Sequence, residues 1–326
     1  MKTMLLPQTD LQVSQILYGC MQIGGKWDKS PVSKHEHRQA ISIIRTALDE
    51  GINFFDHADI YCLGKSEQAF AGVWSEVPHL RDKIVLQTKC GIRFAGDPVD
   101  SSPARYDFSY EHIIHSVNNS LSRLQTDYVD ILLLHRPDPL VEPEEVARAF
   151  DQLHRSGKVR YFGVSNHTAA QISLLRRFLN QPLVVNQIEL NVIHSHVLNA
   201  GVVFNQNQPP LPVRGEGTFE YCRQHDITIQ AWSPLALGSV SGKPISDPNS
   251  VIAKVARLVK TMADEKNASQ EAILVAWLMR LPGQVQPVIG TTNLDRIHAA
   301  CQGDSLALNR EEWYLLFTAG RGAPLP

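Results

Sequence analysis

The 326-residue sequence lacks several features that would assign it to a particular class of protein. Its five cysteines form no Cys-x-x-Cys pair, so they suggest neither a disulfide framework nor a cysteine zinc site. No uninterrupted apolar run approaches the ~18 residues of a membrane-spanning helix. The hydrophobic stretch before Pro7 is only three residues long, too short for the apolar core of a signal peptide. We therefore expect a cytoplasmic protein that is neither exported nor membrane-embedded.

Strong net charge and common phosphate-binding motifs are lacking too. The 31 Lys and Arg residues nearly balance the 33 Asp and Glu residues, so we expect no nucleic-acid partner. No Gly-x-Gly-x-x-Gly follows the first expected strand, which argues against the usual dinucleotide-binding fold. The segment GSVSGKP at 238–244 is one residue too short between its glycines and has Pro244 where a P-loop needs Ser or Thr.

What the sequence does contain is a regular alternation of helical and strand periodicity from residue 40 onward. Eight short runs, apolar on both faces, are typical of parallel strands covered by helices. They lie at residues 16–19, 52–55, 83–89, 128–135, 160–166, 183–190, 227–232 and 285–290. Three expected helix starts have capping-box spacing: Ser33 with Glu36, Thr168 with Gln171, and Asn309 with Glu312.

Eight strands alternating with helices favour a (β/α)₈ TIM barrel over an open doubly wound sheet. Such a barrel takes ~250 residues as one domain, and no linker interrupts the pattern, so we expect residues 1–326 to form a single domain. The segment KTMLLPQTDLQV at 2–13 predicts an N-terminal β-hairpin before the barrel, and residues 309–318 predict an extra C-terminal helix.

Reactive side chains follow three of the expected strands. In a barrel the chemistry lies at the carboxyl ends of the strands, where Asp56, Tyr61, Lys89 and His135 should converge. Tyrosine, with a pKa of ~10, is a weak proton donor at neutral pH, and we expect the lysine ammonium to lower that pKa. Asp56 is suited to hold Lys89, and His135 to orient a carbonyl oxygen, so the set predicts a general acid aimed at a developing alkoxide.

With these residues in this order, the chain resembles an aldo-keto reductase. The resemblance spans nearly the whole chain, in the expected order of strands. It rests on FFDHADIY at 54–61, QTKCG at 87–91, LLLHRPDP at 132–139, GVSNH at 163–167, NQIELN at 186–191, AWSPLALG at 231–238 and VIGTTNLDRI at 288–297.

The resemblance implies NADPH-dependent reduction of an aldehyde or ketone to an alcohol. Tyr61 resembles the proton donor, supported by Lys89, Asp56 and His135. Ser165, Asn166 and Gln187 resemble the groups that bind the nicotinamide carboxamide, and Trp232 the aromatic residue that stacks on the nicotinamide ring. Ser233, Leu235 and Gly238 resemble the loop over the pyrophosphate, while Gly290, Thr291, Thr292 and Arg296 resemble the segment around the adenosine phosphate.

The sequence departs from the family near the adenosine phosphate. The family often has Lys or Arg where Gly290 stands, and an acidic residue and Asn where Ala299 and Ala300 stand. The phosphate site then depends on Arg296 and nearby hydroxyls. An arginine fork suits a 2′-phosphate better than a bare ribose, so we expect NADP(H) rather than NAD(H). The alternatives for Arg296 are a cap on its own helix or a pair with Asp295.

Two other functions remain open at this stage. One is a metal-dependent barrel hydrolase that uses His57, Asp59, His135, His194 and His196 as ligands, although Lys89 would place a positive charge beside the metal. The other is a cofactor-binding sensor with low turnover. For the reductase we expect no metal, a small-molecule carbonyl substrate selected by loops 22–31, 93–110 and 204–217, and a monomer or small homo-oligomer. Cys90 is expected to pack rather than react.

Overall fold

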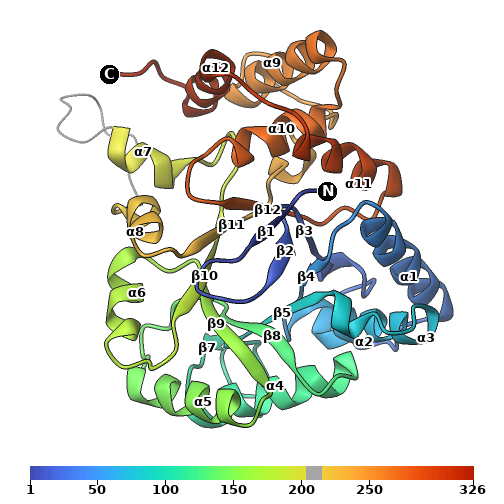
Figure 1. Ribbon diagram of the computed structural model, residues 1–326, viewed down its shortest axis with the longest axis vertical. Coiled ribbons are helices and arrows are strands. Elements are labelled where there is room, and N and C mark those ends of the chain that lie inside the picture. Colours follow the sequence, from blue (N-terminus) through green and yellow to red (C-terminus); the bar gives the residue numbers. More distant parts are fainter. Residues whose placement is uncertain (203–214) are drawn as a thin grey trace.

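A computed structural model of the chain describes residues 1–202 and 215–326. In these ranges eight parallel strands close into a barrel, with neighbours in the order β3, β4, β5, β8, β9, β10, β11, β12 (Figure 1). The strands are β3 Leu17–Gly19, β4 Phe54–Asp56, β5 Val85–Cys90, β8 Val129–Leu134, β9 Val159–Ser165, β10 Leu183–Glu189, β11 Thr228–Trp232 and β12 Val285–Ile289. All eight predicted strands are confirmed, each within two residues at either end.

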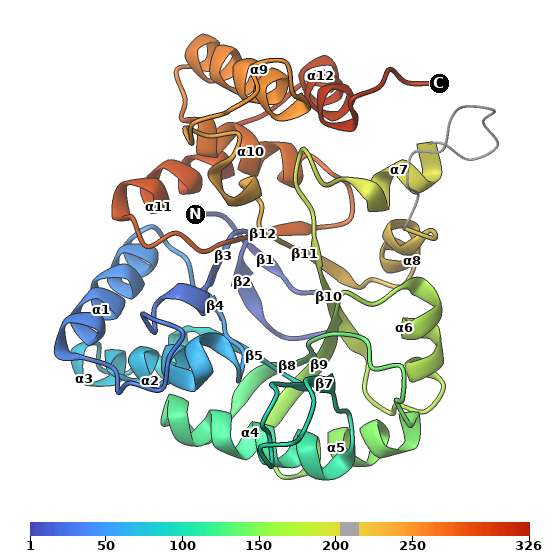
Figure 2. The same cartoon turned by 180° about the vertical axis from the view of Figure 1, so that it is seen from behind.

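Helices surround the barrel and cover the outer faces of the strands, and α9 and α12 lie outside α10 (Figures 1 and 2). They are α1 Lys34–Asp49, α2 Lys65–Ala71, α3 Val73–Glu76, α4 Tyr110–Leu124, α5 Pro143–Arg155, α6 Ala169–Arg176, α7 His196–Val202, α8 Thr218–Gln224, α9 Val251–Lys266, α10 Gln270–Met279, α11 Leu294–Cys301 and α12 Arg310–Arg321. The three predicted capping boxes, at α1, α6 and α12, are confirmed with both reciprocal hydrogen bonds. Within the described ranges every helix is too short or too polar to cross a bilayer.

The predicted N-terminal hairpin is confirmed as β1 Thr3–Leu5 paired antiparallel with β2 Gln12–Ser14. It lies across one end of the barrel (Figure 1), where Leu6, Leu11 and Val13 pack into the lower lumen. The predicted closing helix is confirmed as α12, whose Trp313 ring stacks on Trp277 of α10 with 5.2 Å between centroids. The hairpin closes the amino ends of the strands and leaves their carboxyl ends open.

Alternate residues of each strand face the lumen, because side chains of a strand point to opposite faces. The lower lumen is apolar and includes Phe54 of β4, Val85 of β5 and Val185 of β10. Two residues further along the same strands come Asp56, Gln87 and Gln187. The same two-residue period therefore moves from an apolar core to polar groups as each strand nears its carboxyl end.

Candidate active site

Asp56, Lys89 and His135 stand at the carboxyl ends of three neighbouring strands. Asp56 is the last residue of β4, Lys89 lies near the end of β5, and His135 directly follows β8. β5 pairs with both β4 and β8, which brings the three side chains to one sector of the lumen. Tyr61 begins the short 3₁₀ turn η2 Tyr61–Gly64 that follows β4. The four residues predicted from the sequence are thus gathered in one place.

The Lys89 ammonium is the centre of this group. Its Nζ donates hydrogen bonds to Asp56 Oδ2 at 2.7 Å, Tyr61 Oη at 2.8 Å and the His57 carbonyl oxygen at 2.9 Å. Lys89 and Asp56 are fully buried, so this ion pair is shielded from water. With three acceptors for three ammonium hydrogens, the position of Nζ is fixed.

The pKa of Tyr61 moves in the direction opposite to the prediction. Burial raises it above the ordinary value of 10.0, and the opposing effect of the Lys89 ammonium does not compensate. Burial by itself would lower the pKa of Lys89, but Asp56 and Tyr61 raise it overall. The expectation of a lowered tyrosine pKa was wrong because it counted the ammonium and omitted desolvation. Both side chains consequently hold their protons at neutral pH.

His135 contributes a neutral imidazole. Burial, together with Lys89 and Arg136, holds its pKa well below the usual 6.5. Its ring lies edge-on to the Tyr61 ring, with 5.9 Å between centroids, and its Nδ1 has no partner among the described residues. A neutral imidazole can donate one hydrogen bond without bringing a positive charge beside Lys89.

Next to His135 along the barrel wall, on β9, β10 and β11, the residues expected to bind a carboxamide form a connected set. The Ser165 hydroxyl donates to the Gln187 carbonyl oxygen at 2.8 Å, and Asn166 Nδ2 donates to Ser165 Oγ at 2.9 Å. Trp232 Nε1 donates to Asn166 Oδ1 at 3.1 Å, which orients the indole at the end of β11. Asn166 has a φ of 62°, a left-handed conformation that asparagine tolerates better than most residues.

The remaining predicted residues lie on the loops after β11 and β12. Ser233 and Leu235 precede the 3₁₀ turn η4 Ala236–Gly238, and Gly238 ends it with a φ of 81°. Gly290, Thr291 and Thr292 follow β12 directly, and the Thr291 carbonyl oxygen accepts a hydrogen bond from Tyr18 Oη at 2.9 Å. Both loops leave the same end of the barrel as the group around Lys89.

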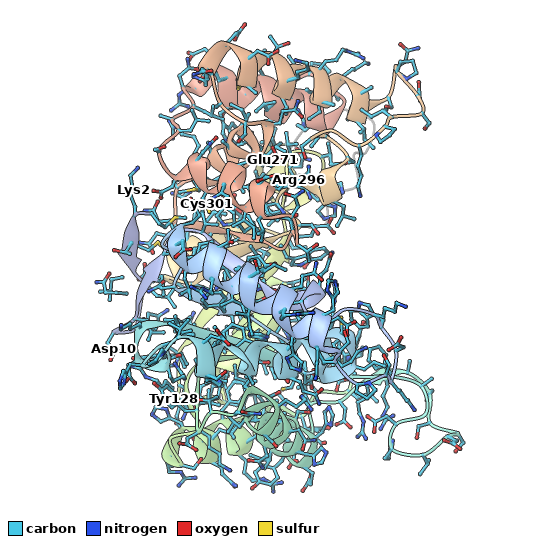
Figure 3. The ribbon with its side chains drawn as sticks, turned by 90° about the vertical axis from the view of Figure 1, so that its right-hand side faces the viewer. Lys2, Asp10, Tyr128, Glu271, Arg296 and Cys301 are labelled. Carbon is cyan, nitrogen blue, oxygen red and sulfur yellow. The ribbon has the colours of Figure 1, made fainter. Side chains whose placement is uncertain are left out.

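Arg296 has partners that the sequence did not indicate. It neither caps its own helix, since Asn293 does that, nor pairs with Asp295. Its Nε donates to Glu271 Oε1 at 2.9 Å (Figure 3), and Nη2 donates to the Ser241 carbonyl oxygen at 2.7 Å. Arg296 therefore links α11 to α10 and to the loop after β11.

A second cation, missed in the sequence, lies beside this arginine. The position that a Cβ would take on Gly238 is 3.5 Å from Lys243 Cε and 3.6 Å from Arg296 Nη1. The two cationic side chains thus converge on the backbone of Gly238, although they are 53 residues apart. The sequence signal for it is the lysine of GSVSGKP, a segment that does not match a P-loop but still places a cation in the loop after β11.

The structure does not gather the metal-ligand set considered above. Among the described residues no group of three or more His, Cys, Asp or Glu side chains is placed to hold a metal ion. His57 is fully buried with its ring edge-on to Phe70, and His194 Nδ1 lies 4.0 Å from Glu189 Oε2.

Cys90 is buried, and burial raises its pKa well above 9.0, which fits the expected packing role. Most of the predicted loop 204–217 lies outside the described residues.

Comparisons with known proteins show which family the chain belongs to. The family model for the aldo/keto reductase family matches residues 15–316. The chain belongs to the aldo/keto reductase family. It is 37% identical to an uncharacterized oxidoreductase of Bacillus subtilis over 325 residues, 97% of each chain. It is 35% identical to the 6-dehydroglucose reductase of Agrobacterium fabrum over 313 residues, 96% of each chain.

Solved structures confirm the fold of this aldo/keto reductase. The glycerol dehydrogenase of Gluconobacter oxydans superimposes with a TM-score of 0.80 at 24% identity, over 99% of this chain and 97% of the other. Together, the family and the named relatives make this chain an NAD(P)H-dependent oxidoreductase of the class that reduces carbonyl groups. That result favours the predicted reductase over the metal-dependent hydrolase.

Proposed function

We propose that this aldo/keto reductase uses NADPH to reduce an aldehyde or ketone to an alcohol, with Tyr61 as the proton donor. The observation that carries the proposal is the bonding of Lys89. Because the Lys89 ammonium donates to Tyr61 Oη, the phenolic O–H is not used in this hydrogen bond and is available to donate to a substrate. Tyr61 accepts a hydrogen bond from the Lys89 ammonium, and its raised pKa means that it still carries its own proton at neutral pH.

The residues present fit a nicotinamide cofactor. Such a group needs amide and hydroxyl partners for its carboxamide, an aromatic face for its ring and cations for its phosphates. Ser165, Asn166 and Gln187 supply the first, and Trp232, partly exposed at the end of β11, supplies the second. Lys243 and Arg296 supply the cations beside the Gly238 turn, where Ser233 and Leu235 also lie. Gly290, Thr291 and Thr292 complete the proposed set.

When it is bound, the cofactor supplies the hydride, and the chain supplies the proton and the orientation. His135 is neutral and adjacent to Tyr61, so it is suited to donate a hydrogen bond to the carbonyl oxygen of the substrate. Tyr61 then transfers its proton to that oxygen as negative charge develops. The buried Lys89 ammonium stabilises the phenolate that remains, and Asp56 keeps the ammonium charged and in place.

Tyr61→Phe should lower the rate of carbonyl reduction at least tenfold, because positioned acid catalysis is typically worth roughly 10²- to 10⁴-fold. The dissociation constant for NADPH should stay nearly the same. The rate is followed by the loss of NADPH absorbance with a panel of aldehydes and ketones. The panel should include oxidised sugars and polyol-derived carbonyls, because relatives are named for 6-dehydroglucose and glycerol.

The matched control is Tyr128→Phe. Tyr128 directly precedes β8, at the other end of the barrel (Figure 3), and its ring contacts Arg81, so the loss of its hydroxyl should leave the rate unchanged. A Tyr61→Phe enzyme that kept more than about a tenth of the rate would show that another group is the acid. A wild-type protein that binds NADPH but oxidises it with no carbonyl compound would support the sensor instead.

A further inference from the structure

The upper lumen contains a layer of amides where a barrel ordinarily packs branched apolar side chains. Gln87, Gln187 and Gln230 project from β5, β10 and β11, and each is at least 98% buried. They form a continuous hydrogen-bonded chain with Asp56. Gln87 Nε2 donates to Asp56 Oδ1 at 2.6 Å and to Gln230 Oε1 at 2.8 Å, and Gln187 Nε2 donates to the same Gln230 oxygen at 3.0 Å.

The register of the strands explains how this chain forms. Asp56 and Gln87 are direct partners on β4 and β5, and Gln187 and Gln230 are direct partners on β10 and β11. In the order of the barrel, β12, β3 and β4 separate β11 from β5. Three strands also separate them in the other direction, so the Gln87–Gln230 hydrogen bond crosses the lumen and joins β5, which carries Lys89, to β11, which ends in Trp232.

The charge on Asp56 fixes the direction of every bond in this chain. An ionised carboxylate only accepts hydrogen bonds, so the Gln87 atom facing it must be the amide nitrogen. That nitrogen has a second hydrogen, so the Gln230 atom facing it must be an oxygen. Gln187 in turn must present its nitrogen to that oxygen, which leaves Gln187 Oε1 as a free acceptor.

We propose that Gln87 and Gln230 are positioning residues that transmit the polarity of Asp56 across the lumen and hold Gln187 with its oxygen toward the cofactor carboxamide. This inference rests on the proposed function, in which Gln187 binds that carboxamide. The carboxamide NH₂ is a donor, so it requires the acceptor end of the glutamine. The Asp56 carboxylate then both holds Lys89 beside Tyr61 and, through the chain of amides, orients Gln187 toward the cofactor carboxamide.

Two unpartnered atoms support a role beyond packing. Gln87 Oε1 and Gln230 Nε2 are buried without a hydrogen-bond partner among the described residues. Unpartnered buried polar atoms cost stability, and apolar side chains of similar shape would avoid that cost. Amides at these positions make sense if their function is to fix which end of Gln187 faces the cofactor, rather than to form as many hydrogen bonds as possible.

The test compares the binding of two cofactors by Gln230→Met, a variant of similar shape without the acceptor. The probes are NADP⁺ and its 3-acetylpyridine analogue, in which a methyl group replaces the carboxamide NH₂. Wild type should bind NADP⁺ roughly 3- to 10-fold more tightly, the usual value of one hydrogen bond. In Gln230→Met this ratio should fall to about one. Binding is read from tryptophan fluorescence and needs no turnover.

Gln286→Met is the matched control. Gln286 is fully buried and is the direct partner of Gln230 on β12, but its Nε2 donates to the Ser14 carbonyl oxygen, outside the chain of amides. It should lose stability comparably and keep the wild-type binding ratio. Gln87→Met gives a second reading if Gln230→Met does not fold, because it releases Gln230 and should also lower the ratio.

The outcomes separate this inference from the function on which it rests. A lowered ratio in Gln230→Met or Gln87→Met, with the ratio retained in Gln286→Met, supports the positioning role. An unchanged ratio in both variants, an equal loss in Gln286→Met, or a wild type that binds both probes equally overturns it and leaves the reductase intact. A wild type that binds neither NADP⁺ nor NAD⁺ overturns the proposed function as well.

Discussion

Burial controls the charge state of the individual residues at this site. Lys89 keeps its proton because Asp56 and Tyr61 outweigh the effect of its desolvation on its pKa. Tyr61 keeps its proton because desolvation outweighs Lys89, and His135 stays neutral because desolvation and Lys89 act in the same direction. The site therefore combines a protonated phenol with a neutral imidazole, the states required to donate to a carbonyl oxygen.

The pH dependence of the reaction follows from these directions. The lowered pKa of His135 keeps its imidazole neutral at every pH above that value, and the raised pKa of Tyr61 keeps its phenol protonated through the neutral range up to pH 9. We expect kcat/KM for reduction, which reports the free enzyme, to vary by no more than about twofold between pH 6 and 9. A steady-state pH profile tests this, and a step near pH 6.5 that disappears in His135→Asn would contradict it.

At the scale of elements, one arginine joins three segments that are distant in sequence. Arg296 of α11 bonds to Glu271 of α10 and to Ser241 in the loop after β11, and Lys243 of that loop lies next to it. The loop that carries Gly238 is thereby attached to the two helices beside it. Position 290 carries no cation, and Lys243 places one beside Arg296 from a different loop.

Cofactor preference should depend on this junction. Arg296→Ala should weaken NADPH binding roughly 10- to 100-fold, the value of a charge-assisted hydrogen bond, and weaken NADH binding far less. Lys243→Ala should give a smaller loss in the same direction. Both are measured by fluorescence titration with the two cofactors. Glu271→Gln is the control, because it removes the ion pair and keeps the cation, and equal losses for NADPH and NADH in Arg296→Ala would rule out contact with the 2′-phosphate.

At the scale of the whole molecule, buried titratable groups tie stability to pH. Burial lowers the pKa of His57 to about 3 and of His167 to about 4, and lowers that of His135 well below 6.5. It raises the pKa of Asp59 to about 7. Burial also lowers the pKa of His112. Between pH 5 and 6 the unfolded chain therefore binds more protons at these histidines than the folded chain does, while the folded chain holds an Asp59 proton that the unfolded chain releases.

The free energy of unfolding should consequently fall as the pH drops through this window. His57, His167 and Asp59 together give a net difference of about one proton, and His135 and His112 add to it in the same direction, so the slope should exceed roughly 1 kcal/mol per pH unit. Urea unfolding at pH 5, 6 and 7.5 measures it. His57→Leu should reduce the slope by roughly 1 kcal/mol per pH unit, because a buried histidine with two unpartnered nitrogens is removed. His35→Leu, at an exposed position of α1, is the control, and equal slopes for wild type and His57→Leu would contradict the assignment.

The sequence by itself determined the order of the elements and the placement of Asp56, Tyr61, Lys89 and His135. These follow from local patterns, since a two-residue period, a capping box or a motif at a strand end lies within a few residues of chain. That residues 1–326 form one domain stays a prediction. Only the tertiary structure decided the rise in the Tyr61 pKa, the Glu271 and Lys243 neighbours of Arg296, and the Gln87–Gln230 bond between residues 143 apart in sequence. Desolvation and contacts across the lumen depend on distances through space, and closing the barrel is what sets those distances.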